Sequence, residues 1–326
     1  MEIIRGQHNL RDKHRGCVLT IGNFDGVHRG HQALIAQAGA RAKELGLPLA
    51  VLSFEPTPRE FFSPDTVAGR VATFRSRIAL LSAQGVDRLI LQRFDKKFAA
   101  YDPSAFVEQL LVGKLGVRAL VIGDDFRFGA KRAGDYAMLD AAGVAQGFDV
   151  ARMNSYEVHG LRVSSSAVRD ALGQGRMDDT ARLLGRPYRI SGHVVHGRKL
   201  GRELGFRTLN LRFAHWKPAA GGIFVVLVHG LSDTPLAGVA NLGVRPSLDP
   251  NDVNGGRVLL ETHCLDWPSS LGTEGAYGKI IRVELLHKLH GELKYDGLDA
   301  LKAGIAKDCD DARAYLASLH AQTHRQ

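Results

Sequence analysis

The chain has 326 residues, 44% of them hydrophobic, and a formal net charge of +9 at pH 7. This length allows two domains, each with its own core, and the composition excludes a largely disordered chain. Lysines and arginines are scattered among acidic residues, so the sequence has no dense basic run of the kind typical of nucleic-acid-binding proteins. The positive net charge is compatible with binding of small anionic substrates.

The sequence also shows no pattern typical of a membrane-spanning segment or of a signal peptide. No apolar stretch approaches the ~20 residues that cross a bilayer, and the N-terminal segment lacks the apolar core of a signal peptide. The cysteines Cys17, Cys264 and Cys309 lie far apart without metal-ligand spacing, which is typical of free thiols in a reducing compartment. We therefore expect a cytoplasmic protein that binds neither nucleic acid nor membrane; a homo-oligomer is compatible with the sequence.

The first predicted unit is a strand, a turn and a helix. The apolar run Cys17–Ile21 predicts the strand, and apolar residues at helical spacing predict a helix over Gln32–Leu45. A helix start offers free N–H groups and a positive dipole end to phosphate. The histidines His28 and His31 can add donors to a polyphosphate there. One such histidine is usually a cap, but two behind a glycine-bearing turn favour a nucleotidyl-transfer site.

Strands and helices then alternate along the first half of the chain. Strands are predicted over Leu49–Phe54, Arg88–Phe94, Arg118–Ile122 and Phe148–Met153, and helices over Arg75–Gln84, Pro103–Leu115 and Gly134–Gln146. This alternation predicts right-handed crossovers and a parallel sheet with ligands at the carboxyl ends of its strands. We expect a Rossmann-like α/β nucleotide-binding domain over residues 1–185.

Three loops that follow these strands carry side chains suited to ligands. The first has Phe54, Pro56 and Pro58, the second has Asp125, Phe126 and Phe128, and the third is Ser164, Ser165 and Ser166, followed by Arg169. Taken singly, each has a plain structural interpretation: a strand terminator, an acidic turn with aromatic rings in the core, and a capped helix.

The second half changes to period-two segments after Arg186. Strands are predicted over Tyr188–His196, Gly222–Val228, Leu236–Asn241, Val258–Leu265 and Lys279–His287. Short strands separated by Gly, Pro and Asp turns predict a small antiparallel β-barrel over residues 186–326. A final helix, with an apolar stripe from Leu298 to Leu319, is expected to pack on this barrel.

A glycine-rich segment carries the chemistry of the second half. Gly197, Gly201 and Gly205, with Lys199 between them, allow backbone and a cation to approach phosphate, whereas the plain alternative is a flexible surface loop. If Phe206–Leu211 is extended, Thr208 and Asn210 project to one face. Neutral oxygens of this kind suit Mg²⁺ that is completed by water and substrate phosphates.

These motifs occur in the order of a known family. The chain resembles the bacterial bifunctional riboflavin kinase/FMN adenylyltransferases, also called FAD synthetases, in the segments Gly22–His31, Ser164–Arg169, Gly205–Asn210, Ala237–Pro246 and Leu259–Asp266. The last segment is similar to the family's Glu-x-His-x-x-Asp strand, with Glu261 as its glutamate. The resemblance covers nearly the entire chain and implies an FMN adenylyltransferase domain followed by a riboflavin kinase domain.

The resemblance also implies roles for individual residues toward the substrates ATP, riboflavin and FMN. His28, His31 and Arg169 would stabilise the triphosphate during adenylyl transfer, and Glu261 would be the base of the kinase step. The implied nucleotide contacts are Gly22, Asn23, Phe24, Asp25, Gly26, Ser164, Ser165, Ser166, Gly197, Lys199, Gly201 and Gly205. The implied flavin contacts are Phe54, Pro56, Pro58, Asp125, Phe126, Phe128 and His290, and the implied Mg²⁺ ligands are Thr208 and Asn210.

Three residues depart from the family pattern. Thr57 replaces a usual histidine, Arg207 replaces the proline of the flavokinase signature, and His290 stands where arginine is frequent. Arg207 and His290 keep open the alternative of an FMN adenylyltransferase with weak or lost kinase activity. A flavin-binding sensor and, ranked low, a basic nucleic-acid-binding protein are alternatives from other classes.

Overall fold

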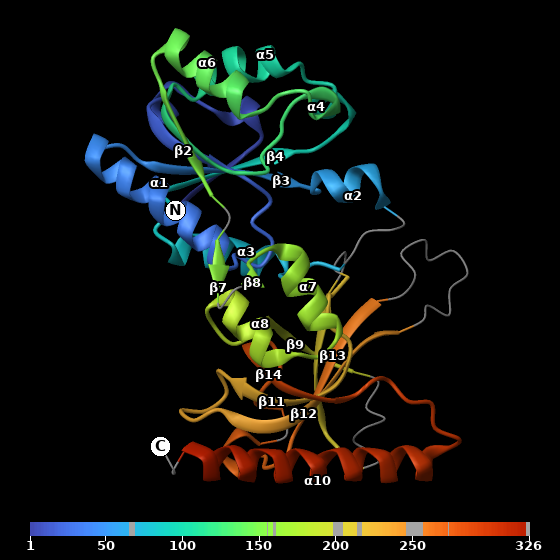
Figure 1. Cartoon of the computed structure of the whole chain (residues 1–326). Helices are drawn as coiled ribbons and strands as arrows, with labels where there is room; N and C mark the ends of the chain where they lie inside the picture. Colours follow the sequence, from blue (N-terminus) through green and yellow to red (C-terminus); the bar gives the residue numbers. More distant parts are fainter. Residues whose placement is uncertain are drawn as a thin grey trace. The chain divides into compact units, whose positions relative to one another are not determined.

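The structure is a computed structural model that describes residues 1–64, 69–154, 156–158, 161–197, 205–213, 217–245, 257–272 and 274–323. The chain divides into two compact units, one of Met1–Val67 with Phe74–Ser165 and one of Ala68–Thr73 with Ser166–Gln326. Figure 1 shows a sheet with helices in the first unit and a barrel with a long helix in the second. Among the described residues, no helix has the length and apolar character needed to cross a membrane.

The first unit contains a six-stranded parallel sheet in the order β1-β4-β3-β2-β5-β6. Its strands are β1 Glu2–Arg5, β2 Cys17–Ile21, β3 Leu49–Glu55, β4 Arg88–Arg93, β5 Val117–Gly123 and β6 Asp149–Met153. The predicted parallel sheet is confirmed. The edge strand β1 was not predicted; it is short, two of its four residues are charged, and only Ile4 is buried.

Helical segments connect these strands. They are η1 Gln7–Asn9, η2 Asp12–His14, α1 Arg29–Leu45, α2 Pro58–Phe62, α3 Phe74–Ala83, α4 Lys96–Ala99, α5 Pro103–Ala105, the π-helical η4 Phe106–Lys114, η5 Ala130–Arg132 and α6 Tyr136–Gln146. A short antiparallel pair, β7 Glu157–Val158 and β8 Leu161–Arg162, follows β6.

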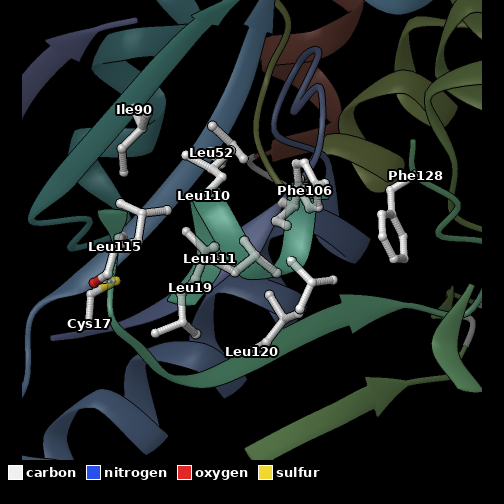
Figure 2. Packing of buried hydrophobic residues seen from close by; sticks show 14 of the residues in the cluster. Cys17, Leu19, Leu52, Ile90, Phe106, Leu110, Leu111, Leu115, Leu120 and Phe128 are labelled. Atoms are coloured by element: carbon white, nitrogen blue, oxygen red, sulfur yellow. Dashed lines mark hydrogen bonds between the residues drawn. The ribbon is translucent and has the colours of Figure 1, made fainter. Parts of the chain in front are cut away.

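Both faces of the sheet are covered by apolar side chains. The two sides of β2 show this, since Leu19 belongs to a core cluster with Leu110 of η4, whereas Val18 belongs to a second cluster with Ile35 of α1. Figure 2 shows the first cluster, in which Leu110 and its neighbours pack against the strands. Such two-sided burial explains why the central strands are continuous apolar runs.

The second unit contains a closed antiparallel barrel in the order β10-β13-β12-β11-β14-β9. Its elements are α7 Ser165–Gly173, which starts at the boundary of the units, α8 Met177–Leu184, β9 Arg189–Val195, β10 Thr208–Phe213, β11 Gly222–His229, β12 Leu236–Arg245, β13 Arg257–Cys264, η6 Ser269–Leu271, β14 Ile280–His290 and α10 Leu298–Thr323. The predicted small barrel is therefore confirmed.

The long helix α10 packs on the outer face of the barrel, as predicted. Cys309 and Ala312 of α10 form a buried cluster with Val225 of β11 and Val239 of β12. The apolar stripe ends before the helix does, because Leu319 is 38% exposed.

A short segment from the first half of the chain belongs to the second unit. The backbone of Arg70 bridges Pro218, and the Tyr188 hydroxyl donates to the Val71 carbonyl at 2.9 Å. No pattern in the sequence predicts that this segment joins the second unit, and the domain division predicted at residue 185 stays a prediction.

Candidate active sites

The first candidate site is the loop between β2 and α1. His28 is the N-cap of α1, and its Nδ1 accepts a hydrogen bond from the backbone N–H of His31 at 3.3 Å. An accepting Nδ1 places the proton of a neutral imidazole on Nε2, which can donate to a ligand oxygen. The positive end of the α1 dipole therefore lies beside an imidazole that can donate a hydrogen bond.

Three rings pack together at this helix start. The imidazoles of His28 and His31 stack with centroids 3.6 Å apart and planes 16° apart, and the Phe24 ring lies 5.0 Å from His31. A Cβ on Gly30 would come within 3.3 Å of the His28 ring and 3.4 Å of the Val163 carbonyl oxygen. A glycine at position 30 therefore leaves the space that the His28 ring occupies. The structure brings the two predicted histidines together.

The backbone of the loop is strained at two buried residues. Phe24 and Val27 have φ angles of 51° and 41°, and both side chains are fully buried. Such φ values cost a residue other than glycine about 1–3 kcal/mol and persist only where the surroundings over-determine them. Both side chains belong to the core cluster beneath α1, and this packing holds the loop in its path.

A buried arginine holds the same loop from the side of α3. Arg77 is 3% exposed, donates from Nη1 to the Asn23 carbonyl at 3.2 Å and from Nη2 to Glu55 Oε2 at 2.7 Å. The Ser53 hydroxyl also donates to the Asn23 carbonyl, at 3.3 Å. Arg77 thereby ties the loop after β2 to the end of β3. The sequence analysis missed it, although an arginine four residues before Leu81, on the buried stripe of α3, was a signal.

The predicted flavin residue Phe54 lies in a cluster of aromatic rings. Its centroid is 5.8 Å from that of Phe94 and 5.7 Å from that of Phe98. The rings of Phe61 and Phe62, from α2, also pack on Phe94, and Phe62 is 65% exposed. This surface of rings suits a planar apolar ligand. The sequence analysis included only Phe54 of these five.

The two predicted prolines bracket a helix cap. Pro58 is the first residue of α2, and Thr57 is its N-cap. The Thr57 hydroxyl accepts from the Glu60 backbone N–H at 3.4 Å, and the Glu60 carboxylate accepts from the Thr57 N–H at 2.8 Å. Thr57, the departure from the family's histidine, thus forms a capping box. A flavin contact by Pro56 or Pro58 stays a prediction.

The loop after β5 sets its aromatic rings in a stack. Phe126 and Phe128 lie 5.9 Å apart with planes 17° apart, while Asp125 is exposed. Phe128 is 7% exposed and packs on Phe106 of η4. Phe128 therefore has a core role, whereas Phe126 is only partly buried; their flavin contacts stay predictions.

The predicted serine run surrounds the start of α7. Ser164 precedes the helix, Ser165 and Ser166 are in its first turn, and Arg169 follows one turn later. The Arg169 Nε donates to the Gly69 carbonyl at 2.9 Å within the second unit. His28 belongs to the first unit, so joint action of Arg169 with the histidines stays a prediction.

The second candidate site lies on the outer face of the barrel. The Asn210 Nδ2 donates to the Thr208 carbonyl at 3.1 Å and to its hydroxyl at 3.4 Å. Asn210 pairs with Glu261 across the β10–β13 ladder, and residues opposite each other in an antiparallel ladder share a face. Three of the residues predicted for the second half of the chain therefore lie together.

Asn210 also offers an oxygen with the character that Mg²⁺ prefers. Asn210 is 3% exposed, and its Oδ1 is buried without a hydrogen-bond partner among the described residues. Neutral oxygens of Thr208 and Asn210 fit an ion that keeps waters and takes phosphate ligands. In the part of the chain that the structure describes, no three His, Cys, Asp or Glu side chains form an alternative metal cluster.

One end of the glycine-rich segment, Gly197, lies beside Asn210. A Cβ on Gly197 would come within 2.6 Å of the Asn210 Nδ2, so only glycine fits against the carboxamide. Gly205 has a φ of 88°, in the left-handed region. Lys199 and Gly201 lie outside the described residues. The phosphate role of this segment stays a prediction.

The strand that carries Thr208 is anchored through the residue that replaces the family's proline. The His263 Nδ1 donates to the Arg207 carbonyl at 2.9 Å, and the His263 ring makes an edge contact with Phe206 at 5.3 Å. Only the backbone carbonyl of Arg207 takes part in this hydrogen bond. The bond therefore forms although arginine stands where the family has proline.

His290, a predicted flavin residue, bonds to α10. Its Nε2 lies 2.8 Å from Asp308 Oδ1, and its Nδ1 lies 2.7 Å from the Gly291 carbonyl. Burial opposes the charged imidazole, but the bonds to Asp308 and Gly291 outweigh it and raise the pKa of His290. A flavin contact by this residue stays a prediction.

The cysteines are unsuited to nucleophilic catalysis. Cys17, Cys264 and Cys309 are buried free thiols. Burial raises the pKa of Cys17 and of Cys264 to about 12, so neither supplies a thiolate near neutral pH.

Family models match both halves of the chain. One described as FAD synthetase matches residues 10–167, and one described as riboflavin kinase matches residues 184–316.

Similar proteins cover nearly the whole chain. A bifunctional riboflavin kinase/FMN adenylyltransferase from Pseudomonas fluorescens is 45% identical over 97% of this chain and 98% of its own length. Proteins of the same name from Haemophilus influenzae and Escherichia coli K12 are 42% and 44% identical, over 98% and 97% of this chain and 100% and 98% of theirs. A crystal structure titled macrolide-efflux protein, from Streptococcus pneumoniae, has a TM-score of 0.77 and 25% identity, covering 96% of this chain and 99% of that one.

Proposed function

The chain belongs to the bifunctional riboflavin kinase/FMN adenylyltransferase family, and we propose on that premise that it makes FAD from riboflavin in two ATP-dependent steps. The barrel phosphorylates riboflavin to FMN, and the parallel-sheet unit adenylylates FMN. The observation that carries the second step is the stacked pair His28 and His31 at the start of α1.

In the adenylyl step, an FMN phosphate oxygen attacks the α-phosphorus of ATP. The bond from that phosphorus to the bridging oxygen breaks, and pyrophosphate leaves with the electron pair. The reaction needs no protein nucleophile, which agrees with the buried, high-pKa thiols. His28 and His31 contribute fixed donors at the helix start, where charge develops on the phosphates, and Arg169 is proposed to hold the leaving pyrophosphate.

In the kinase step, Glu261 takes the proton of the terminal ribityl hydroxyl. The hydroxyl oxygen attacks the γ-phosphorus of ATP, and ADP leaves. The pairing of Glu261 with Asn210 across the β10–β13 ladder supports this role, because it places the base beside the proposed phosphate-binding face. Gly197, which packs on Asn210, would bring backbone close to the phosphates.

Thr208 and Asn210 are proposed to hold Mg²⁺ at the barrel. When bound with ATP, the ion would supply positive charge that offsets the negative charge of the phosphates. We also propose a cytoplasmic location and small-molecule substrates only, with the oligomeric state left open.

The test is a single incubation of the purified chain with riboflavin, ATP and Mg²⁺, followed by chromatography of the flavins. We expect FMN and then FAD to form without added FMN. FAD formation only from added FMN would instead favour the adenylyltransferase with lost kinase activity, the alternative suggested by Arg207 and His290. Formation of neither product would contradict the proposal.

A further inference from the structure

One row of paired residues crosses the outer face of the barrel. Asn210 pairs with Glu261 across β10 and β13, and Glu261 pairs with Asn241 across β13 and β12. Asn241 lies on the outer face, because Val239, two residues earlier, packs against α10, while the flanking Ala240 is fully buried in the barrel. Glu261 therefore stands between two carboxamides whose side chains share its face.

Both carboxamide oxygens are buried without a partner among the described residues, but the two amide groups differ. The Asn210 amide group donates to Thr208. Within the described residues, Asn241 makes no side-chain hydrogen bond, and its Oδ1 is buried without a partner. A buried oxygen that lacks a donor is destabilising, and native proteins rarely leave such an atom without a protein, water or ligand partner. Asn241 therefore needs a hydrogen-bond donor from outside the described chain.

The character of the missing partner follows from the atom and its neighbours. Phosphate oxygens are acceptors, so they do not satisfy a carboxamide oxygen, whereas hydroxyl groups do. The proposed phosphate elements, Thr208 and Gly197, lie on the Asn210 side of Glu261. On the Asn241 side, a Cβ on Gly243, two residues further along β12, would meet the Glu292 carboxylate. That side of the base therefore presents the Asn241 carboxamide and the Glu292 carboxylate, whose oxygens can accept hydrogen bonds from a chain of hydroxyl groups.

We propose that Asn241 binds the ribityl chain of riboflavin. Its Oδ1 accepts a hydrogen bond from one internal ribityl hydroxyl, and this bond holds the terminal hydroxyl beside Glu261. The inference rests on the proposed kinase function and adds the residue that recognises the polyol. Asn241 is a binding residue in this account, so its loss acts on riboflavin and not on ATP.

The test measures phosphorylation of riboflavin by Asn241→Leu, which keeps the approximate size and removes the acceptor. We expect kcat/KM for riboflavin to fall about ten-fold, the effect of one lost hydrogen bond of about 1–1.5 kcal/mol, while KM for ATP stays within two-fold. The matched control is Thr262→Val. The Thr262 hydroxyl also lacks a partner among the described residues, but Thr262 pairs with the inward-facing Ala240, so this variant should keep the wild-type kcat/KM.

A second measurement uses wild-type protein and 2′-, 3′- and 4′-deoxyriboflavin, each of which keeps the terminal hydroxyl. With the wild type, we expect kcat/KM for one analogue to be about ten-fold lower than kcat/KM for riboflavin. With Asn241→Leu, kcat/KM for the same analogue should lie within two-fold of that for riboflavin. If all three react like riboflavin, or Asn241→Leu matches the wild type, the inference is wrong. If the wild type phosphorylates no riboflavin at all, the proposed kinase function fails instead.

Discussion

Individual residues at the start of α1 form the proposed adenylyl site. His28 caps the helix, His31 stacks on it, and Phe24 supports His31 from the core. Sequence spacing predicted the two histidines at a helix start. It could not predict the stack, which depends on the strained path of the loop through Phe24 and Val27.

The substitution His31→Ala tests the role of the stacked pair. We expect FAD formation from FMN to fall about 100-fold or more, as when a fixed transition-state donor is removed. FMN formation from riboflavin should not change, because the kinase residues lie in the other unit. The control is His8→Ala, at an exposed histidine of the first unit, which should leave both rates intact. Equal loss of both activities in folded His31→Ala would contradict this assignment.

Arg77 supplies a second residue-scale prediction. In Arg77→Met the Asn23 carbonyl and the Glu55 carboxylate lose their donor, so we expect the free energy of unfolding to fall by about 1–3 kcal/mol and the FMN adenylylation rate to fall with it. Urea denaturation and a rate assay measure the two effects. Arg75→Met is the matched control, since Arg75 is an exposed neighbour on α3. The two variants should differ in both measurements; identical behaviour would rule out the clamp.

At the scale of elements, the first turns of α10 make a close contact with the segment that joins β14 to this helix. A Cβ on Gly304 would collide with the Tyr295 ring and hydroxyl. An alanine in a helix interior is normally about 1 kcal/mol better than glycine, but Gly304→Ala must displace Tyr295. We therefore expect Gly304→Ala to lower the free energy of unfolding of the wild-type chain. In a Tyr295→Ala background, which lacks the ring, the same substitution should raise the free energy of unfolding.

The control for this prediction is a helix glycine with room. A Cβ on Gly39 of α1 would make only an ordinary contact, at 3.6 Å from Leu49 Cδ2. Gly39→Ala should therefore stabilise the chain by about 1 kcal/mol. Stabilisation by Gly304→Ala equal to that of Gly39→Ala would show that the Tyr295 contact is unimportant.

The bond from β14 to α10 is expected to depend on pH. The pKa of His290 is raised in the folded chain, so the stabilisation is fully present below the unfolded histidine value of about 6.5 and is lost as pH rises through the folded value. The stability advantage of wild type over His290→Gln should therefore be larger at pH 5.5 than at pH 9, measured by urea denaturation.

A neighbouring histidine controls for this pH effect. His287 stacks on Tyr315 of the same helix at 4.7 Å, and no ion pair of His287 occurs among the described residues. His287→Gln should keep the pH dependence of the wild type. An advantage over His290→Gln that stays constant with pH would contradict a role for the His290–Asp308 pair.

At the scale of the whole molecule, pattern predicted the two architectures because each follows from local periodicity. Apolar runs that alternate with helices specify a sheet buried on both faces, and period-two segments specify the barrel. Contacts between distant residues were not predictable in this way. Arg77 meets Asn23 across 54 positions, and the segment at Val71 joins Tyr188 in the second unit.

In the candidate sites too, features that follow from local pattern were predictable, and features that depend on contacts between distant residues were not. The shared face of Thr208 and Asn210 followed from strand alternation alone. The place of Asn241 next to Glu261 required the register of β12 and β13, which no short motif contains. The bond of His290 to Asp308 likewise required the docking of α10.

We propose that the two reactions use separate catalytic residues, His28 and His31 for adenylyl transfer and Glu261 for phosphorylation. The most direct measurement is FAD formation from riboflavin by a mixture of His31→Ala and Glu261→Gln proteins. The first should supply FMN and the second should adenylylate it, so the mixture should make FAD while neither variant does so alone. A mixture as inactive as its parts, or loss of both half-reactions in either folded variant, would contradict the account.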